Sequence, residues 1–252
     1  MHSPHSDARF PSESAPASNA HADLAPVVVP RYLQTTYWWA YLHPSGVRLF
    51  ERQWLVNLIL WGNFSRLRDA ALREMGSVIE GDVLQVACVY GDFTEQLARR
   101  LSPDAHLHVI DVAPIQISNL LTKLKLKLKC QRQVTVLQQD ATALRFADAS
   151  KDAVVVFFLL HEQPVDVRRK TVTEAWRVLK PGGKLIFVDY HRPRASSPFR
   201  YLMVPILAVL EPFAMDLWRD EISSCLPSGQ LAAKLEKQTY FGDLYQKVVI
   251  TR

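Results

Sequence analysis

The sequence predicts an α/β protein built on an open, mostly parallel sheet. After Gly81, five short apolar runs with strand character alternate with helical patterns, and such strands indicate a parallel sheet covered by helices on both faces. The chain then ends in two strand-like runs around Gly242-Asp243, which is the signal of a hairpin. We therefore expect the sheet to close with an antiparallel edge.

The expected elements follow one another in a regular order. The strands are VLQVAC (83–88), HLHVID (106–111), VTVLQQ (134–139), AVVVFFLL (153–160) and KLIFVDY (184–190). The helical patterns between them are Phe93–Leu101, Ile115 to about Lys129, and Val165–Leu179.

Length and composition limit the kinds of protein that fit. A chain of 252 residues forms one large domain or at most two small ones. A hydrophobic fraction of 48% excludes a mainly disordered chain, and three cysteines are too few for a disulfide-stapled scaffold, which indicates a reducing, cytoplasmic compartment. Nine glycines are about half the usual share of ~7%.

Residues 1–30 are rich in Ser, Pro, Ala and His and show no apolar period, so we expect a disordered tail. No secretory signal is visible, because the longest apolar run of this segment is too short. The tail carries one arginine and three acidic residues, so the basic charge of the chain lies beyond it. Anionic partners are therefore favoured, although no nucleic-acid module is recognisable.

Residues 31–76 form a predicted N-terminal aromatic helical region with four of the six tryptophans. Apolar residues recur at helical spacing from Val47 to Trp61, Gly62-Asn63 breaks the run, and a second amphipathic helix continues to Gly76. Three interpretations of these tryptophans remain open. They are ordinary core residues, they cover an apolar substrate pocket, or they lie at a lipid headgroup boundary.

The stretch FRYLMVPILAVLEPFAM (199–215) is unusually apolar for a segment between a strand and a hairpin. Pro205, Glu211 and Pro212 interrupt it, so it does not qualify as a membrane span. Two interpretations remain: a buried helix pair, or a hydrophobic helical lid over a lipophilic substrate at about 195–235. We place both within a domain at 77–252.

Polar residues at the strand ends indicate a nucleoside cofactor. Asp111 ends the second strand about twenty residues after the first strand–helix turn, where a carboxylate accepts from ribose hydroxyls, and Asp140 follows the third strand. With EAWRVLKPGGKLIFVDY (174–190), this order resembles class I S-adenosylmethionine-dependent methyltransferases, especially the quinone-biosynthesis C-methyltransferases, from about Gly81 to Tyr190. The resemblance implies a Rossmann-like fold that binds S-adenosylmethionine through Gln85, Ala87, Val89, Tyr90, Gly91, Asp111, Val112, Asp140 and Ala141.

The first turn departs from that family's acidic-x-Gly-x-Gly-x-Gly motif. Gln85 replaces the acid, Ala87 and Val89 replace the first two glycines, and only Gly91 is retained. Glycine allows a close approach of the backbone and a positive φ, which a β-branched residue does not do cheaply. Either the site is inactive, or the methionine part of the cofactor is held differently.

A narrower resemblance includes this altered turn. TYWWAYLHP, LVNLILWGNFSRLRDAAL, VLQVACVYGDFTEQLA, IDVAPIQISNL and EPFAMDLWRDEI together resemble the bacterial RquA family of rhodoquinone biosynthesis proteins over residues 31–252. The resemblance implies that ubiquinone is the substrate and that a ring methoxy group is replaced by an amino group. It also implies S-adenosylmethionine as amino donor, together with Mn(II).

The residues agree with a changed reaction. A nucleophilic amine must lose its proton, and Gln85 in place of an acid lowers the amine's pKa. We expect the turn to present the nitrogen to the ring, with Tyr90, His161 and Asp189 as catalytic residues. Carboxylates and imidazoles suit a hard divalent ion, and those near the strand ends are Asp92, His161, Glu162, Asp189 and His191.

Lysines 123, 125, 127 and 129 belong to a predicted surface helix. Solvation explains them, but beside a lipid-tailed substrate they also suit an anionic membrane. We therefore expect a cytoplasmic protein bound peripherally to the inner face of the bacterial membrane. Two other functions stay open: a conventional methyltransferase acting on a quinone or phenol, and a non-catalytic quinone-binding pseudo-enzyme.

Overall fold

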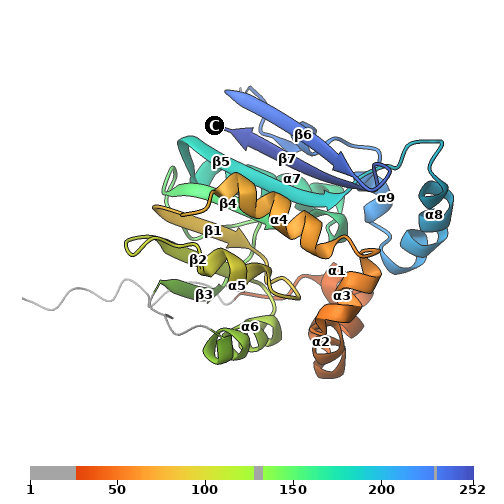
Figure 1. Cartoon of the computed structure of the whole chain (residues 1–252), viewed down its shortest axis with the longest axis horizontal. Helices are drawn as coiled ribbons and strands as arrows, with labels where there is room; N and C mark the ends of the chain where they lie inside the picture. Colours follow the sequence, from red (N-terminus) through yellow and green to blue (C-terminus); the bar gives the residue numbers. More distant parts are fainter. Residues whose placement is uncertain (1–26, 128–132, 230–231) are drawn as a thin grey trace, which may run out of the picture.

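The computed structural model describes residues 27–127, 133–229 and 232–252, so almost all of the predicted tail lies outside the described residues. A seven-stranded sheet with the order β3-β2-β1-β4-β5-β7-β6 forms the centre (Figure 1). β1 to β5 are parallel, and β7 pairs antiparallel with both β5 and β6. The predicted α/β fold is confirmed. The strands are β1 (Asp82–Val86), β2 (His106–Asp111), β3 (Val134–Gln138), β4 (Lys151–Phe157), β5 (Leu179–Tyr190), β6 (Lys234–Tyr240) and β7 (Tyr245–Thr251).

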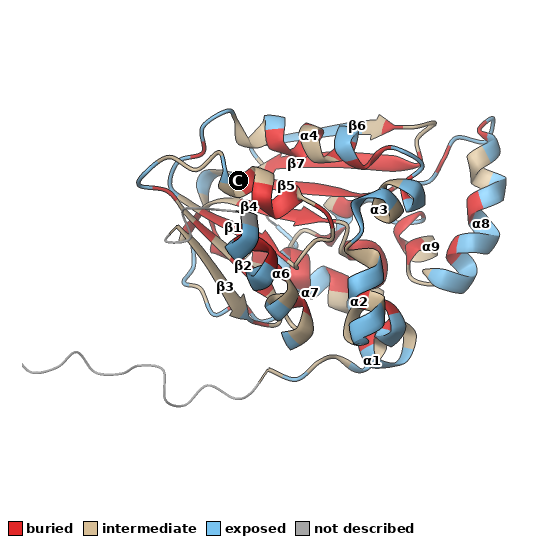
Figure 2. Ribbon diagram, turned by 60° about the horizontal axis from the view of Figure 1, so that its bottom comes forward, coloured by how far each residue is buried: buried red, intermediate tan, exposed pale blue. Residues whose placement is uncertain are grey.

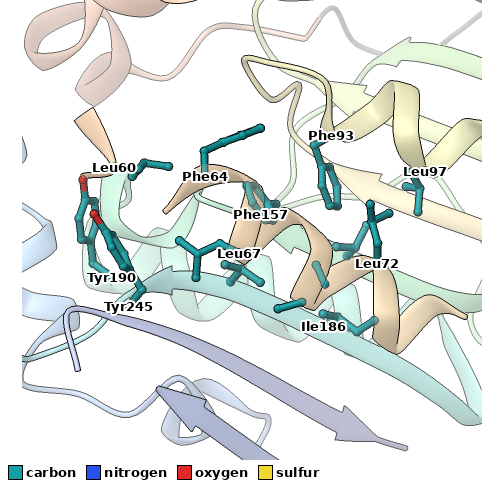
Figure 3. Close-up of a cluster of buried hydrophobic side chains, with 14 of the residues drawn as sticks. Leu60, Phe64, Leu67, Leu72, Phe93, Leu97, Phe157, Ile186, Tyr190 and Tyr245 are labelled. Carbon is teal, nitrogen blue, oxygen red and sulfur yellow. The ribbon is translucent and has the colours of Figure 1, made fainter. Parts of the chain in front are cut away.

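Helices cover both faces of the sheet, as the apolar strands require. On one face, α4, α5 and α6 pack against alternate strand residues such as Val83 and Val155; Figure 3 shows part of this cluster, in which Phe93 stacks on Phe157 with ring centroids 4.4 Å apart. On the other face lie α7 and the short helix η3. These helices are α4 (Phe64–Met75), α5 (Phe93–Ala98), α6 (Pro114–Lys127), α7 (Val165–Val178) and η3 (Ile222–Cys225).

Two helical segments lie outside the alternating strand–helix pattern. The first precedes α4 and consists of α1 (Arg31–Thr36), a π-helical turn (Trp38–Leu42), α2 (Pro44–Phe50) and α3 (Gln53–Ile59). The second follows β5 and contains α8 (Pro198–Leu210) and α9 (Ala214–Leu217). Both project at the same end of the molecule, on the right in Figure 1.

The single helix expected from Val47 to Trp61 is wrong. Arg52 adopts an extended backbone and separates α2 from α3. The neighbouring Glu51 accepts hydrogen bonds from Asn119 and Lys123 of α6, so this stretch follows the surface of α6 instead of continuing straight.

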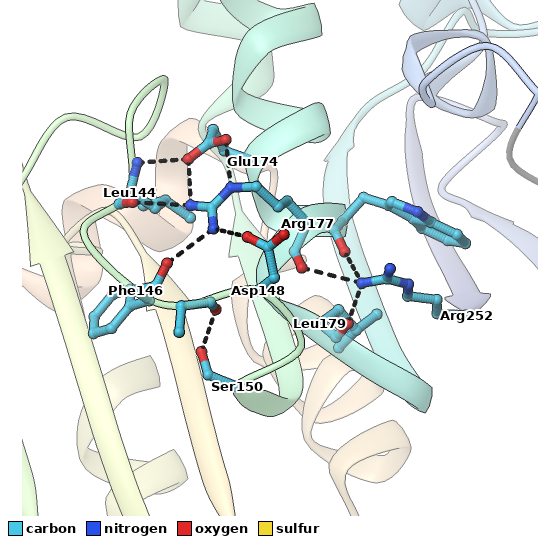
Figure 4. Close-up of polar contacts among 10 residues, drawn as sticks. Leu144, Phe146, Asp148, Ser150, Glu174, Arg177, Leu179 and Arg252 are labelled. Atoms are coloured by element: carbon cyan, nitrogen blue, oxygen red, sulfur yellow. Dashed lines mark hydrogen bonds and ion pairs between the residues drawn. The ribbon is translucent and has the colours of Figure 1, made fainter.

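A partly buried arginine, Arg177, fixes one of the loops. Arg177 of α7 pairs with Glu174 and with Asp148 and donates to the carbonyl groups of Leu144 and Phe146, so it holds the loop between β3 and β4 (Figure 4). The hairpin turn after β6 has three consecutive residues with positive φ, and Gly242 occupies its centre, as the sequence predicts.

Candidate active site

A cavity of about 1310 Å³, part of it open to solvent, lies at the carboxyl ends of β1, β2, β3 and β4. Ligands of open α/β sheets bind at this edge. The residues after each of these four strands line the cavity, and the N-terminal helical region and Glu211 close it from the other side. It therefore joins the predicted nucleoside site to the two added segments.

The half of the cavity beside β2 and β3 carries two fixed carboxylates. The Oδ2 atom of Asp111 accepts from the backbone N–H of Cys88 and Oδ1 accepts from that of Ala113, both at 2.8 Å. Burial raises the pKa of Asp111 to about 6, although these N–H groups oppose the shift. Asp140 accepts from the backbone N–H and the hydroxyl of Thr142, both at 2.8 Å. We call this the adenosine half, because its polar groups fit a ribose and an adenine.

The turn after β1 has the backbone shape of a glycine-rich loop, although Gly91 is its one glycine. Ala87 has φ +73° and Gly91 has φ +82°. A left-handed backbone costs an alanine about 1–2 kcal/mol. At Gly91 a Cβ atom would come within 2.8 Å of Phe64, so glycine is required there. Gln85 is fully buried and does not line the cavity; its amide donates to Ala87 O and Thr94 Oγ1.

Tyr90 lines the cavity, but its hydroxyl is engaged elsewhere. The hydroxyl donates to the carbonyl of Ala40 and accepts from Gln116 Nε2, both at 2.7 Å, and the ring stacks on Tyr41. The hydroxyl of Tyr90, which we expected to be catalytic, therefore already has a donor and an acceptor partner within the protein. Lys123, expected on a solvated face, is instead buried and donates to Gly91 O and Glu51.

The opposite half of the cavity holds a buried acid–base cluster. His161 Nδ1–H donates to Asp189 Oδ1 at 2.8 Å, and Asp189 also accepts from the backbone N–H groups of Leu160 and Tyr190. The other ring nitrogen, Nε2, lies 3.8 Å from Glu162 Oε1 and 3.9 Å from Glu211 Oε2. Asp189 does not line the cavity, so it orients the His161 ring from behind. We call this the reaction half.

Burial and mutual charge shift the protonation of this cluster. Burial disfavours charged His161, but Asp189, Glu211 and Glu162 outweigh it and raise the pKa of His161 to about 9. Burial, together with the charge on Glu211, raises the pKa of Glu162 to about 8. The pKa of Glu211 is raised for the same reason of burial. The cluster therefore holds exchangeable protons near neutral pH, as a general acid–base group requires.

Of the five predicted metal ligands, His161, Glu162 and Asp189 lie in one cluster, and the other two are engaged elsewhere. Asp92 forms an ion pair with Arg68 at 2.8 Å, and His191 Nδ1–H donates to the carbonyl of Asp243. Within residues 27–127, 133–229 and 232–252, no group of three or more His, Cys, Asp or Glu side chains has the arrangement of a metal site. The predicted Mn(II) site is not supported.

The remaining predicted residues divide between the two halves. Ala87, Val89, Tyr90, Asp111, Val112, Asp140, Ala141, His161 and Glu162 line the cavity, whereas Gly91 does not. Sequence reasoning missed Glu211 and Tyr41, which both line the cavity. Glu211 had a signal, because it is the one charged residue between Tyr201 and Met215. A charge inside an apolar run is buried with a partner or has a function.

Comparison with known proteins relates the central part of the chain to methyltransferases. Residues 83–183 match the model of the methyltransferase domain family. The match spans the sheet from β1 into β5 and the helices between these strands. Solved structures agree on the fold: a SAM-dependent methyltransferase from Aquifex aeolicus has a TM-score of 0.52 and 20% identity, with 82% of this chain and 97% of that chain covered. Phosphoethanolamine N-methyltransferase 2 of Haemonchus contortus has a TM-score of 0.58 and 15% identity, with 89% and 60% covered.

The curated relatives of this chain carry names from quinone biosynthesis. Demethylmenaquinone methyltransferase of Renibacterium salmoninarum is 34% identical over 158 residues, which are 61% of this chain and 61% of the relative. The ubiquinone/menaquinone biosynthesis C-methyltransferase UbiE of Pseudomonas paraeruginosa is 28% identical over 163 residues, 62% of each. The chain thus spans about three fifths of the length of these two relatives.

Proposed function

We propose that this protein is a transferase that uses S-adenosylmethionine to modify the ring of a quinone. The single observation that carries the proposal is the continuity of one cavity from the adenosine half, with Asp111, to the reaction half, with His161. The wall between them is apolar and aromatic, from residues such as Phe157 and Tyr190, which suits a flat ring. The names of the relatives support a quinone as the substrate class.

We further propose that the group transferred is the amino group, so that ubiquinone becomes rhodoquinone. Val89 lines the cavity at a position where the family motif has glycine, and Tyr90 lines it beside Val89, which favours a displaced methionine end. Gln85 provides no negative charge to stabilise the donor's ammonium group, because its side chain is neutral and points into the protein interior.

The reaction half then has a defined task. The donor's amine must lose a proton before its lone pair attacks the ring carbon that bears the methoxy group. Glu162, with a pKa of about 8, accepts the amine proton through its ionised fraction, and His161, protonated near neutral pH, donates the proton that the methoxy group takes up. Asp189 holds the imidazole in place. The new C–N bond replaces the C–O bond, and the methoxy group leaves with a proton as methanol. The bond between nitrogen and the methionine Cα then breaks by elimination: a proton leaves the adjacent Cβ, a C=C bond forms in the amino-acid fragment, and nitrogen takes up a proton, which leaves a free amino group on the ring.

Methyl transfer to a quinone or phenol is the second candidate. Ala87 favours it, since the turn retains the positive φ of the methyltransferase motif despite the loss of glycine. In this reaction the ionised fraction of Glu162, beside the protonated His161–Asp189 pair, would remove a ring hydroxyl proton, and the activated ring would attack the methyl group.

Isotope labelling distinguishes the candidates. The purified protein is incubated with ubiquinone and S-adenosylmethionine labelled with ¹⁵N at the amino group in one reaction and ¹³C at the methyl group in another, with and without Mn(II). Mass spectrometry of the quinone is expected to show ¹⁵N in the ring substituent and no ¹³C. Entry of ¹³C alone would support the methyltransferase, and entry of neither label would support a non-catalytic quinone-binding protein.

A loop variant tests the role of the altered turn. Combining Gln85→Asp, Ala87→Gly and Val89→Gly restores the family motif and is expected to abolish ¹⁵N transfer while S-adenosylmethionine still binds. Full amino transfer by this variant would contradict the role proposed for the turn. The exposed substitution Asp104→Asn is the control, and it should transfer ¹⁵N as the unmodified protein does.

A further inference from the structure

We propose that α3 and α8 dock the protein on an anionic membrane surface and that the cavity opens toward this surface. The proposal rests on the proposed function only for the identity of the tailed quinone that would enter there. We define the docking face by its exposed apolar side chains on the two added segments: Trp38, Trp54, Leu58 and Trp61, and Tyr201, Leu202, Val204 and Val209.

α8 is apolar on all sides but packs along a single stripe. Met203 and Leu207 are its buried residues, whereas Val209 is 78% exposed, and Arg200 is its one charged residue. A helix that is hydrophobic all round is normally buried. The described part of the chain leaves most of the surface of α8 uncovered, so an apolar environment outside the protein is needed.

α3 continues the same surface. Trp54 is 61% exposed and Leu58 is 64% exposed, and no residue of α3 is buried. Trp61, just after α3, contacts Phe199 at the start of α8 with ring centroids 5.4 Å apart, so the two segments lie side by side. Figure 2 shows exposed stretches on both of them at the same end of the molecule. Together they form one face rather than two isolated patches.

The charges on this face favour a lipid bilayer over a protein partner. Residues 31–63 and 191–210 contain six arginines, no lysine and one acidic residue, Glu51, which is paired with Lys123. Among the arginines, Arg48 and Arg52 are exposed beside the docking face. A basic rim around tryptophan, tyrosine and leucine side chains is the composition of interfacial helices bound to anionic lipid.

The length of α8 determines how the helix sits in the bilayer. Its 13 residues extend about 20 Å, less than the ~30 Å of the hydrocarbon core. In the described part of the chain, no helix is long and apolar enough to cross a membrane. We infer that α8 and α3 lie in the plane of the headgroups with their apolar side chains in the acyl region.

The cavity is continuous with this face. Trp39 and Ile59 are 38% and 40% exposed, and both also line the cavity. A quinone whose tail remains among the lipid chains can therefore place its ring in the cavity without the tail entering water. This site differs from the lysine-rich stretch that the sequence suggested, since Lys123 of that stretch is buried against the loop after β1.

Vesicle binding tests the proposal with the full chain and without cofactor or quinone. Co-sedimentation is measured with vesicles of phosphatidylcholine alone and with added phosphatidylglycerol. We expect binding that increases with phosphatidylglycerol, and at least about tenfold weaker binding for Trp54→Ser/Leu58→Ser and for Leu202→Ser/Val209→Ser. Leu126→Ser and Leu235→Ser are matched controls, because these leucines are exposed outside the docking face. They should bind within about twofold of the unmodified protein.

Three results would overturn the proposal. The first is binding that does not increase with phosphatidylglycerol, and the second is an equal loss of binding in the control variants. The third is a protein that does not bind vesicles but forms a dimer, which the docking-face variants disrupt. The affinity for S-adenosylmethionine, measured by calorimetry, verifies that each variant is folded. Vesicle binding requires no turnover, so the two experiments are independent. A negative result in the isotope experiment does not affect the vesicle test, and a negative vesicle test does not affect the isotope result.

Discussion

The two halves of the cavity are built from different parts of the chain. The adenosine half comes entirely from the ends of β1, β2 and β3, and its carboxylates are fixed by backbone N–H groups two to four residues beyond a strand end. The reaction half combines the ends of β4 and β5 with Glu211 from the segment after α8 and tyrosines from the N-terminal helices. The first half lies within residues 83–183, which match the methyltransferase domain model, whereas the second combines His161 and Glu162 of that range with Asp189, Glu211 and tyrosines outside it.

The difference shows where binding and reaction are separated. Asp111 and Asp140 each sit beside N–H donors that stabilise a negative charge, which suits steady hydrogen bonding to a sugar and a base. In the reaction half, Glu162 and Glu211 share one imidazole and compete with each other for charge. Such an arrangement moves protons easily. Substitutions in the two halves should therefore affect different measured constants.

The largest effect is expected at His161. His161→Gln keeps a polar side chain of similar length but removes the titratable nitrogen, so kcat should fall at least about 100-fold. The affinity for S-adenosylmethionine should stay within about twofold, because Asp111 and Asp140 are untouched. Steady-state kinetics and calorimetry measure the two quantities separately.

The control for His161 is His106→Gln, which removes an imidazole that contacts Thr135 and does not line the cavity. This variant should retain kcat within about twofold. If His161→Gln kept full kcat, proton transfer would have to occur outside the reaction half, and the division of the cavity would be wrong.

A smaller effect is expected in the adenosine half. Asp111→Asn removes the charge that would bind the ribose hydroxyls, and a hydrogen bond to a charged group contributes about 1.5–3 kcal/mol. We expect the affinity for S-adenosylmethionine to fall about 10- to 100-fold, with kcat at saturating cofactor within about threefold. Asp104→Asn is the exposed control. A large loss of kcat with unchanged affinity would show that the halves do not act separately.

The extent to which the sequence predicted this molecule follows the same division. Alternating apolar strands and helices, Asp111 and Asp140 were readable because their signals are local, at a fixed distance from a strand end. The cluster was readable only in part: His161, Glu162 and Asp189 follow strands, but Glu211 reaches His161 across a long sequence separation. The engagement of Tyr90 with Ala40 and the burial of Lys123 depend on how the N-terminal helices pack on the loop after β1, and no local pattern encodes that packing.

The smallest effect concerns stability and pH, and it comes from Glu162. Its pKa is about 8 in the folded protein, above the ordinary 4.5, so between these pH values the folded state keeps a proton that the unfolded state has lost. The resulting stabilisation is fully present below pH 4.5 and is lost as pH rises through 8. Glu162→Gln resembles the protonated acid at every pH, so its free energy of unfolding should fall less between pH 5 and 8, by about 1–2 kcal/mol. Part of the decline should remain at the upper end, since His161, with a pKa of about 9, has the same sign of dependence.

Urea unfolding at pH 5, 6.5 and 8 measures this pH dependence of the free energy of unfolding, with exposed Glu80→Gln expected to follow the unmodified protein. Parallel pH curves for Glu162→Gln and the unmodified protein would mean that the carboxyl of Glu162 is already charged at neutral pH, and the reaction half would then hold a permanent negative charge instead of an exchangeable proton.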